Sequence, residues 1–445
     1  FTLTPAQMRV LDEIRGDLAG TKPMSRLLQG EVGSGKTVVA AAAMLLAAAN
    51  GHQAALMAPT EILAEQHLES ICRIFDAASG EKGDGKTVRS YSSLLPHPVR
   101  VGLLTGGLKE SARREVLEGI ASEEINIVIG TNALIQKGVD FPQLGLCVVD
   151  EQHRFGVMQR SELRSKGGNP HVLVMSATPI PRTLALTLYG DLDLSIIDEL
   201  PPGRIEIKTK WLSPDQRQRA WDFVRKQVAA GRQAFIICPL VEESEAIETK
   251  AAITEHERLS QNVFPELRLG LLHGRLSSSE KEDVMKRFRG GELDILVATP
   301  VVEVGVDVPN ATVMLIEGAD RFGLAQLHQF RGRVGRGEHQ SYCLLLTDTP
   351  SEDARERLSL LERTGDGFAL AEEDMRLRGP GEFFGTRQSG LPELKMARLS
   401  DLGLLELARK QAIRLFADDP DMRQPEHRLL AAEVKRLWDS GGELN

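Results

Sequence analysis

The sequence predicts an α/β protein with two successive parallel-sheet domains and a small, mainly helical C-terminal region. Three observations support this class. In the first half, short apolar or β-branched runs alternate with longer helical patterns, which is typical of a parallel sheet with helices on both faces. The alternation pauses at the Pro-Pro-Gly sequence of residues 201–203 and then restarts. Strand patterns end after Thr347.

The expected elements follow from the hydrophobic patterns. In the first domain, strands are expected at residues 25–29, 53–58, 99–104, 126–130, 144–149 and 171–176, and helices at 36–50, 61–75, 110–120 and 181–189. In the second, strands are expected at 234–238, 267–271, 295–298, 312–316 and 341–346, and helices at 214–230 and 278–288. The predicted domains span residues 1–203, 204–349 and 350–445.

Two segments depart from these patterns. The polar, Gly-rich segment at residues 79–98 fits neither a strand nor a helix, so a mobile insertion loop is expected there. A Gly/Pro-rich stretch at residues 379–390 is expected to interrupt the helices of the C-terminal region.

Composition is that of an ordinary globular protein, with 42% apolar and 26% charged residues. A net charge of −9 argues against a uniformly basic surface but allows a local basic track for nucleic acid. The longest apolar run, residues 38–49, is too short to span a bilayer, so no membrane partner is expected. The four cysteines form no CxxC pair, which favours reduced thiols in a cytosolic protein. Because residue 1 is Phe, a fragment is expected.

Residues 30–37 match the phosphate-binding pattern G-x-x-x-x-G-K-[ST] between a predicted strand and a predicted helix. The glycines let backbone N–H groups turn toward phosphates, and the helix N-terminus adds a partial positive charge. Lys36 is expected to neutralise the β- and γ-phosphates, and the Thr37 hydroxyl to ligate Mg²⁺. The predicted ATP-binding residues of this phosphate loop are Gly30, Gly33, Ser34, Gly35, Lys36 and Thr37.

Asp150 and Glu151 follow the continuously apolar run at residues 144–149, which is typical of a buried strand. Open α/β sheets bind ligands at the carboxyl ends of their strands, so both carboxylates are expected near the ligand. Asp150 is expected to hold Mg²⁺, and Glu151 to orient and polarise the attacking water. Such a pair alone is more often a solvated loop, and the phosphate loop is what gives it weight.

A basic segment at residues 329–337 contains Arg333 and Arg336. An arginine near the γ-phosphate stabilises the charge that develops during phosphoryl transfer, by about 10³–10⁵ in rate. Both side chains are expected to reach one nucleotide from a helix face. The alternative is a basic patch that contacts other phosphates or solvent.

The distribution of these residues predicts a motor. The phosphate loop and Asp150 belong to the first predicted domain and the two arginines to the second, so ATP is expected in a cleft between the domains. Binding would draw the domains together, and hydrolysis would let them part. A metabolic kinase would need one such domain and a substrate lid, and it would leave the second domain unexplained.

Further segments along the chain resemble a known family. They lie at residues 3–7, 30–37, 58–61, 130–132, 150–157, 176–183, 272–275, 298–300, 303–307, 329–336 and 376–390. In this order they resemble the superfamily 2 helicases and translocases, and most closely the RecG family of bacterial DNA translocases. The resemblance implies two RecA-like domains and a translocation motif at residues 376–390.

The resemblance also implies roles for individual residues. Gln7 would read the adenine edge, and Asp307 would contact the ribose or a nearby arginine. Coupling of hydrolysis to domain movement would involve Gln152, His153, Ser176, Thr178 and Gln329. Thr60, Gly130, Thr131 and Thr299 would contact the DNA backbone, and Arg376, Arg378, Arg387 and Gln388 would transmit motor closure to duplex DNA.

The implied activity is ATP- and Mg²⁺-dependent translocation on double-stranded DNA that remodels stalled forks and Holliday junctions. The implied protein is a monomer of the bacterial cytoplasm, associated with the nucleoid, and single-stranded DNA-binding protein is a candidate partner. The chain departs from the family in four ways. Glu31 replaces an expected Asp, Pro300 replaces an expected Thr, the segment at residues 79–98 is long, and the amino-terminal wedge domain is expected to be absent.

Two alternatives remain open. The motor of a transcription–repair coupling factor shares the Arg-Phe-Gly-Val and translocation segments, although Gln152-His153 and residues 385–388 favour RecG. A DNA-binding scaffold with a decayed ATPase is the other, and the intact Lys36, Asp150 and Arg333 oppose it.

Overall fold

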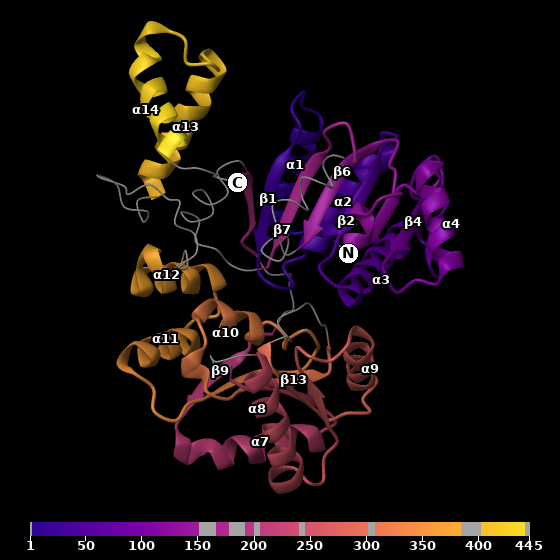
Figure 1. The fold of residues 1–445 in the computed structure, drawn as a ribbon. Helices are drawn as coiled ribbons and strands as arrows, with labels where there is room; N and C mark the ends of the chain where they lie inside the picture. Colours follow the sequence, from indigo (N-terminus) through magenta and orange to yellow (C-terminus); the bar gives the residue numbers. More distant parts are fainter. Residues whose placement is uncertain are drawn as a thin grey trace. The chain divides into compact units, whose positions relative to one another are not determined.

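The computed structural model describes residues 2–150, 166–177, 192–199, 205–239, 245–300, 308–383 and 402–440. The chain divides into two compact units, one of residues 1–179 and 195–370, the other of residues 180–194 and 371–445. The first unit contains two separate α/β sheets (Figure 1), and helices follow the last strand. The predicted class, two parallel-sheet domains with a helical C-terminal region, is confirmed.

The first sheet has eight strands in the order β3-β4-β5-β2-β6-β7-β1-β8. Neighbouring strands from β4 through β1 are parallel, and β3 is antiparallel to β4. The strands are β1 (Ser25–Gly30), β2 (Gln53–Met57), β3 (Val88–Tyr91), β4 (Val99–Leu104), β5 (Ile127–Gly130), β6 (Leu144–Asp150), β7 (His171–Ser176) and β8 (Asp193–Ile197). Every strand predicted for this domain is present, and β3 and β8 are additional.

Four α-helices of this domain are described, α1 (Pro5–Leu18), α2 (Lys36–Ala49), α3 (Glu61–Ser79) and α4 (Glu110–Ala121). Side-chain caps begin two of them, α1 and α3. Thr4 and Gln7 form a reciprocal capping box at the start of α1, with Pro5 in the first turn. The Thr60 hydroxyl accepts from Leu63 N at the start of α3. The helix predicted at residues 181–189 lies outside the described residues.

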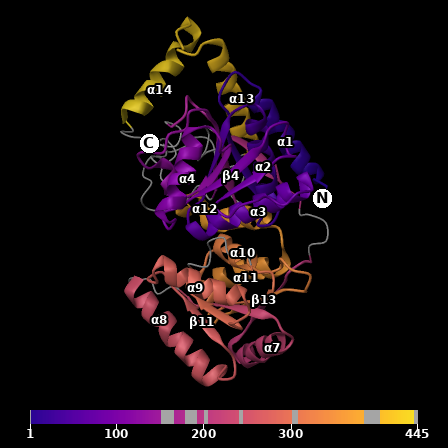
Figure 2. The ribbon, with the colours of Figure 1, turned by 90° about the vertical axis from the view of Figure 1, so that its right-hand side faces the viewer.

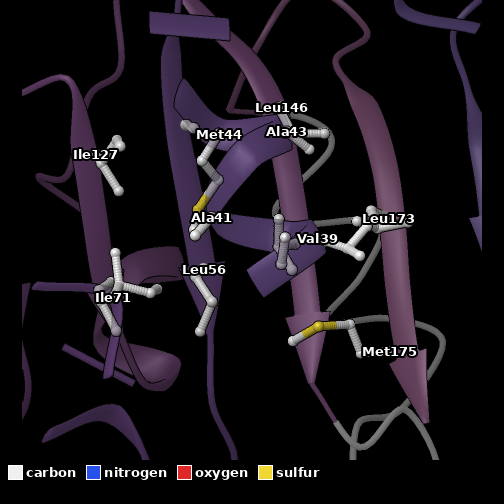
Figure 3. Packing of buried hydrophobic residues seen from close by; sticks show 14 of the residues in the cluster. Val39, Ala41, Ala43, Met44, Leu56, Ile71, Ile127, Leu146, Leu173 and Met175 are labelled. Atoms are coloured by element: carbon white, nitrogen blue, oxygen red, sulfur yellow. The ribbon is translucent and has the colours of Figure 1, made fainter. Parts of the chain in front are cut away.

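The core of the first domain is packed between the sheet and its helices (Figure 3). One face of the sheet presents Leu56, Ile127, Leu146, Leu173 and Met175 to α2 residues such as Val39, Ala43 and Met44. The intervening strand residues Ala55, Cys147 and Val174 are equally buried. Burial on both faces explains why these strands have continuous apolar sequences.

The prediction that residues 79–98 form neither strand nor helix is wrong, because β3 forms within this segment. Residues Val88–Tyr91 pair with β4, and a further bridge joins Asp84 to Ser90. Tyr91 is fully buried, its ring packs edge-on against Phe75 at 5.7 Å, and its hydroxyl donates to the Cys72 carbonyl. An edge strand with one buried aromatic anchor has no apolar run, which is why its sequence resembles a loop.

This anchoring makes a stability prediction. Tyr91→Ala is expected to lower the free energy of unfolding by about 3–5 kcal/mol, because a large aromatic side chain is removed from the core. Tyr91→Phe keeps the ring contact with Phe75 and is expected to cost only about 1 kcal/mol. Urea unfolding of both variants tests this. Equal, small losses would mean that β3 is not anchored to α3.

The second sheet is six-stranded, with the order β11-β12-β10-β13-β14-β9. All of its neighbouring strands are parallel. The strands are β9 (Lys208–Leu212), β10 (Gln233–Ile237), β11 (Leu269–Leu272), β12 (Ile295–Ala298), β13 (Ala311–Ile316) and β14 (Tyr342–Leu346). All five predicted strands are present, and the edge strand β9 is additional.

Helices cover both faces of the second sheet (Figure 2). They are α7 (Arg217–Ala229), α8 (Glu245–Arg258), α9 (Ser278–Arg289), α10 (Leu324–Arg331) and α11 (Glu352–Arg363). Ala234 and Ile236 of β10 pack with Trp221 of α7 on one face. Phe235 and Ile237 pack with side chains of α9, α10 and α11 on the other. This alternation has the period of two that strand geometry requires.

Glu317, which follows β13, is a buried carboxylate in this domain. Its side chain is 9% exposed and accepts a hydrogen bond from Arg217 at 3.1 Å. Burial raises the pKa of Glu317 to about 7, although Arg217 opposes the shift. Because the folded-state pKa exceeds the unfolded one, this group's contribution to stability is full below the unfolded pKa and is lost as pH rises through about 7.

Glu317→Gln is therefore expected to remove a pH-dependent penalty. Relative to the parent, the variant should gain on the order of 2 kcal/mol in unfolding free energy between pH 5 and pH 8. Urea unfolding at both pH values measures the gain. Asp348→Asn is the control, because Asp348 contacts the same Arg217 from an exposed position and should change little. Parallel pH profiles for parent and Glu317→Gln would contradict the prediction.

The C-terminal region contains α12 (Gly367–Phe383), α13 (Leu402–Asp418) and α14 (Arg428–Ser440). The break predicted from residue 379 onward is partly wrong, because α12 continues through Gly379 and Pro380 to Phe383. Residues 384–401 lie outside the described part of the chain. Among the helices that are described, none is both long and apolar enough to cross a membrane.

Candidate nucleotide site

The carboxyl ends of three adjacent strands bring the first group of predicted site residues together. In the sheet, β7 lies between β6 and β1, and all three run in the same direction. Asp150 is the last residue of β6, Ser176 is the last of β7, and the phosphate loop follows β1. This edge is where open parallel sheets bind their ligands.

The phosphate loop has the backbone of an anion cradle. Gly33 and Gly35 have φ values of 83° and 89°, a region that favours glycine. A Cβ on Gly35 would lie 2.2 Å from Gln7 Nε2, so the site also excludes a side chain on steric grounds. No side chain caps α2, and the buried Ser34 hydroxyl has no hydrogen-bond partner among the described residues. An uncapped helix start and an unsatisfied hydroxyl fit a phosphate ligand.

Lys36 lies over this loop. Its Nζ donates to the carbonyls of Gly30 and Glu31 at 2.7 and 2.8 Å. The ammonium group is therefore held against the first residues of the loop, and phosphate oxygens could take the place of these carbonyls as acceptors. Thr37, the next residue, lines the same cavity as Lys36.

Asp150 has a partner that the sequence did not reveal. Its Oδ2 lies 2.7 Å from Nε2 of His67, and their side chains are 13% and 11% exposed. His67 belongs to the buried face of α3, together with Leu63 and Ile71. The position of His67 on the apolar face of a predicted helix could have indicated that its side chain is buried. Its partner Asp150, 83 residues away in sequence, was not predictable.

A cavity of about 630 Å³ is lined by these residues and by residues of the second α/β domain. From the first domain its lining includes Gly33, Lys36, Thr37, His67 and Asp150, and from the second Arg289, Pro309, Arg333 and Arg336. The described residues therefore bring the predicted phosphate and metal ligands together with both predicted arginines. Arg289, the last residue of α9, is an additional cation that sequence reasoning missed.

The expectation that Arg333 and Arg336 share a helix face is wrong. Helix α10 ends at Arg331, and both arginines lie in the turn that follows Gly332. Arg333 is buried, whereas Arg336 is partly exposed and donates from Nε to the Gly332 carbonyl at 3.3 Å. Gly332 is the C-cap of α10, so the helix ends before either arginine.

Gln7 lies beside the phosphate loop and is 5% exposed. Its Nε2 donates to the Ser34 carbonyl at 2.8 Å, and its Oε1 accepts from Thr4 N at 3.0 Å. The amide nitrogen thus connects α1 to the loop, and the amide oxygen caps the start of α1. An adenine could still use the second N–H of Nε2 and the second lone pair of Oε1.

The candidate DNA contacts follow strands of both sheets. Thr60 follows β2, Gly130 ends β5, and Thr131 comes directly after it. Strands β5 and β2 are adjacent in the first sheet, and β2 neighbours β6, the strand that ends in Asp150. Ala58 N donates to the Gly130 carbonyl, which ties the two strand ends together. Thr299 follows β12, is 5% exposed, and its hydroxyl lacks a hydrogen-bond partner within the described part of the chain.

Several predicted residues lie outside the described ranges, namely Glu151, Gln152, His153, Thr178, Asp307, Arg387 and Gln388. Gln329 lies on α10 and is partly exposed. Arg376 lies on α12 and pairs with Glu373 at 2.7 Å. Arg378 belongs to the same helix, and its side chain is not among those described.

Arg331 is a buried residue to which the sequence analysis assigned no role. It is 4% exposed and donates to the carbonyls of Leu361, Thr364 and Gly365 at 3.1, 2.7 and 2.9 Å. The segment of residues 361–365 leads directly into α12. Arg331 therefore fixes the path of the chain between the second sheet and that helix.

Comparison with known proteins agrees with this geometry. Three family models match the chain: DEAD/DEAH box helicase at residues 4–187, helicase conserved C-terminal domain at 217–338, and the C-terminal part of domain 3 of ATP-dependent DNA helicase RecG at 364–441. The solved helicase MrfA bound to DNA, 16% identical with a TM-score of 0.60 over 84% of this chain and 54% of its own, shares the fold. Fold and site define a superfamily 2 helicase motor.

More similar relatives show to which family of these helicases the chain belongs. ATP-dependent DNA helicase RecG of Synechocystis is 54% identical over 100% of this chain and 51% of its own length. RecG of Bacillus subtilis is 51% identical over 100% of this chain and 62% of its own. A structure of RecG bound to a three-way DNA junction has 46% identity and a TM-score of 0.73, over 91% of this chain and 50% of that one. The chain belongs to the RecG family, and it spans about half to three fifths of the length of these relatives.

Proposed function

We propose that this chain is the ATP-hydrolysing motor of a DNA translocase that remodels branched DNA, such as stalled forks and Holliday junctions, in recombination and repair. The observation that carries the proposal is the single cavity lined by the phosphate loop, Asp150, Arg333 and Arg336 in a member of the RecG family. Residues 1–203 and 204–349 would be the two motor domains, and residues 350–445 would transmit their movement.

Each residue of the cavity has a role in this proposal. Gly30, Gly33, Ser34 and Gly35 would bind phosphates through the loop, and Lys36 would neutralise them. Thr37 and Asp150 are the hydroxyl and carboxylate that suit Mg²⁺, which would neutralise charge on the phosphates. Glu151 would orient the attacking water. Gln7 and Asp307 would hold the base and the ribose.

Arg333 and Arg336 would stabilise the charge that develops on the phosphoryl group. They come from the second domain, so their approach would make hydrolysis depend on the relation between the two domains. Gln152, His153, Ser176, Thr178 and Gln329 would couple that movement to hydrolysis. Supporting this, Ser176 ends the strand between the one that carries Asp150 and the one that leads into the phosphate loop.

DNA would be held by its backbone at Thr60, Gly130, Thr131 and Thr299, contacts that fix register without reading sequence. The Thr299 hydroxyl, which has no hydrogen-bond partner among the residues that the structure describes, is available to a phosphate oxygen, whereas Pro300 offers no backbone donor. Arg376, Arg378, Arg387 and Gln388 would transmit motor closure to the duplex. We further propose a monomer in the bacterial cytoplasm, at the nucleoid, with single-stranded DNA-binding protein as a partner.

Steady-state ATP hydrolysis without DNA, with linear duplex and with a three-way junction tests the proposal. Stimulation by DNA, strongest with the junction, is expected. A rate that no DNA changes would favour a binding scaffold with a decayed ATPase. The motor of a transcription–repair coupling factor is less favoured, because the match at residues 364–441 is to a RecG model. Equal stimulation by linear and branched DNA would revive it.

A further inference from the structure

The side chain of Glu31 reaches from the phosphate loop to the start of α12. Its Oε1 accepts a hydrogen bond from Gly367 N at 2.7 Å, across 336 residues of sequence. The same oxygen lies 3.9 Å from Nε2 of His328, and the carboxylate is 17% exposed. A partly buried carboxylate at a helix start is favourable, because it satisfies an N–H group and the helix dipole.

The start of α12 has a second, local cap. Asp366 Oδ1 accepts from Phe368 N at 2.8 Å and from Ala369 N at 3.3 Å. The two carboxylates therefore divide the first amides of α12 between them. Asp366 belongs to the segment that enters the helix, whereas Glu31 belongs to the phosphate loop. The Glu31 contact is therefore placed to respond directly to a ligand in that loop.

The main chain of Glu31 is also tied to Lys36. The Glu31 carbonyl accepts from Lys36 Nζ at 2.8 Å and from Ser34 N at 3.1 Å. A phosphate that takes Lys36 as its counter-ion would remove the first of these bonds. The position of Glu31 thus depends on whether Lys36 donates to the loop or to a ligand.

Helix α12 leads away from this contact toward the translocation motif. It runs from Gly367 to Phe383 and includes Arg376 and Arg378. Upstream, Arg331 fixes residues 361–365 through three carbonyls. With that segment held, a change at Gly367 is expected to act on the start of α12.

We propose that Glu31 relays the state of the phosphate loop to α12. When phosphate draws Lys36 away from the Glu31 carbonyl, the bond between Glu31 and Gly367 weakens and the first turn of α12 loosens. Glu31 acts here as a positioning residue through Gly367. The inference rests on the proposed function, because it requires that the loop bind nucleotide.

Amide hydrogen exchange of peptides covering residues 364–376 tests the relay, with and without the non-hydrolysable analogue AMP-PNP and Mg²⁺ at saturation. In the parent chain, exchange of the first turn of α12 is expected to rise by about tenfold on binding, the loss of one hydrogen bond to a charged group. Glu31→Ala should exchange fast in both states. Glu31→Gln retains an acceptor oxygen of equal reach and should restore most of the response.

Asp366→Ala is the matched control. It removes the local cap of the same helix, so exchange should be faster throughout, but the response to AMP-PNP should persist. A nucleotide response that survives in Glu31→Ala would overturn the relay. Calorimetric titration of the same samples with AMP-PNP tells a failure of the relay from a failure of the proposed function. Binding without any change at α12 would overturn the relay alone, whereas no binding would overturn the proposed function as well.

Discussion

Lys36→Ala is expected to reduce ATP hydrolysis to background, a loss of about 10²–10³-fold or more. The Lys36 ammonium lies over the phosphate loop, bonded to the Gly30 and Glu31 carbonyls. Its removal would leave phosphate charge without its counter-ion in a cavity shared with the carboxylate of Asp150. Release of inorganic phosphate, measured with saturating DNA, is the readout.

The control for this variant is Lys109→Ala, because Lys109 is an exposed lysine at the start of α4 and lies outside the cavity lining. It should hydrolyse ATP like the parent. Circular dichroism and a melting curve establish that Lys36→Ala remains folded. A folded Lys36→Ala protein with near-normal turnover would show that the phosphate loop is not the hydrolytic site.

Arg336→Ala is expected to lower kcat by about 10³-fold while nucleotide binding changes much less. Arg336 is the better test of the two arginines, because Arg333 is 4% exposed and its replacement would also disturb packing. The developing charge of the transition state, rather than the bound nucleotide, is what an inserted arginine stabilises. Single-turnover hydrolysis and equilibrium titration with a fluorescent ATP analogue separate the two effects.

Arg287→Ala serves as the comparison. Arg287 lies on α9, near Asp283 and Glu292, and is absent from the cavity lining. Its loss should leave kcat within about twofold of the parent, as for other exposed ion pairs. If Arg336→Ala instead raised KM and left kcat intact, the arginine would bind the ground state only.

The buried parts of the fold were predictable because local sequence determines them. Strands such as β6 and β13 are mostly apolar runs, and the phosphate-binding pattern carries its own strand–loop–helix context. The edge strands β3, β8 and β9 were missed. The sequence of β9 alternates lysine with half-buried residues, because one side of an edge strand has no neighbour.

In the candidate site, too, some features were predictable from the sequence and others were not. Lys36 and Asp150 were predictable, because their residue types occur in recognisable sequence patterns. Their partners were not: the contacts of His67 with Asp150 and of Glu31 with Gly367 join residues 83 and 336 positions apart. The turn that carries Arg333 was mistaken for a helix face. It contains Gly335, whose φ of 78° and lack of room for a Cβ against Ile207 only the folded chain reveals.

The strand order of the first sheet has a practical consequence. Three steps separate β2, which precedes the candidate DNA contact Thr60, from β1, which precedes the phosphate loop. At about 4.8 Å a step, hydrogen bonds fix that separation near 14 Å. The distance between these two strands is therefore expected to stay constant. A pair of spin labels on β1 and β2 should report an unchanging distance through the whole catalytic cycle, and it would calibrate any label pair that does move.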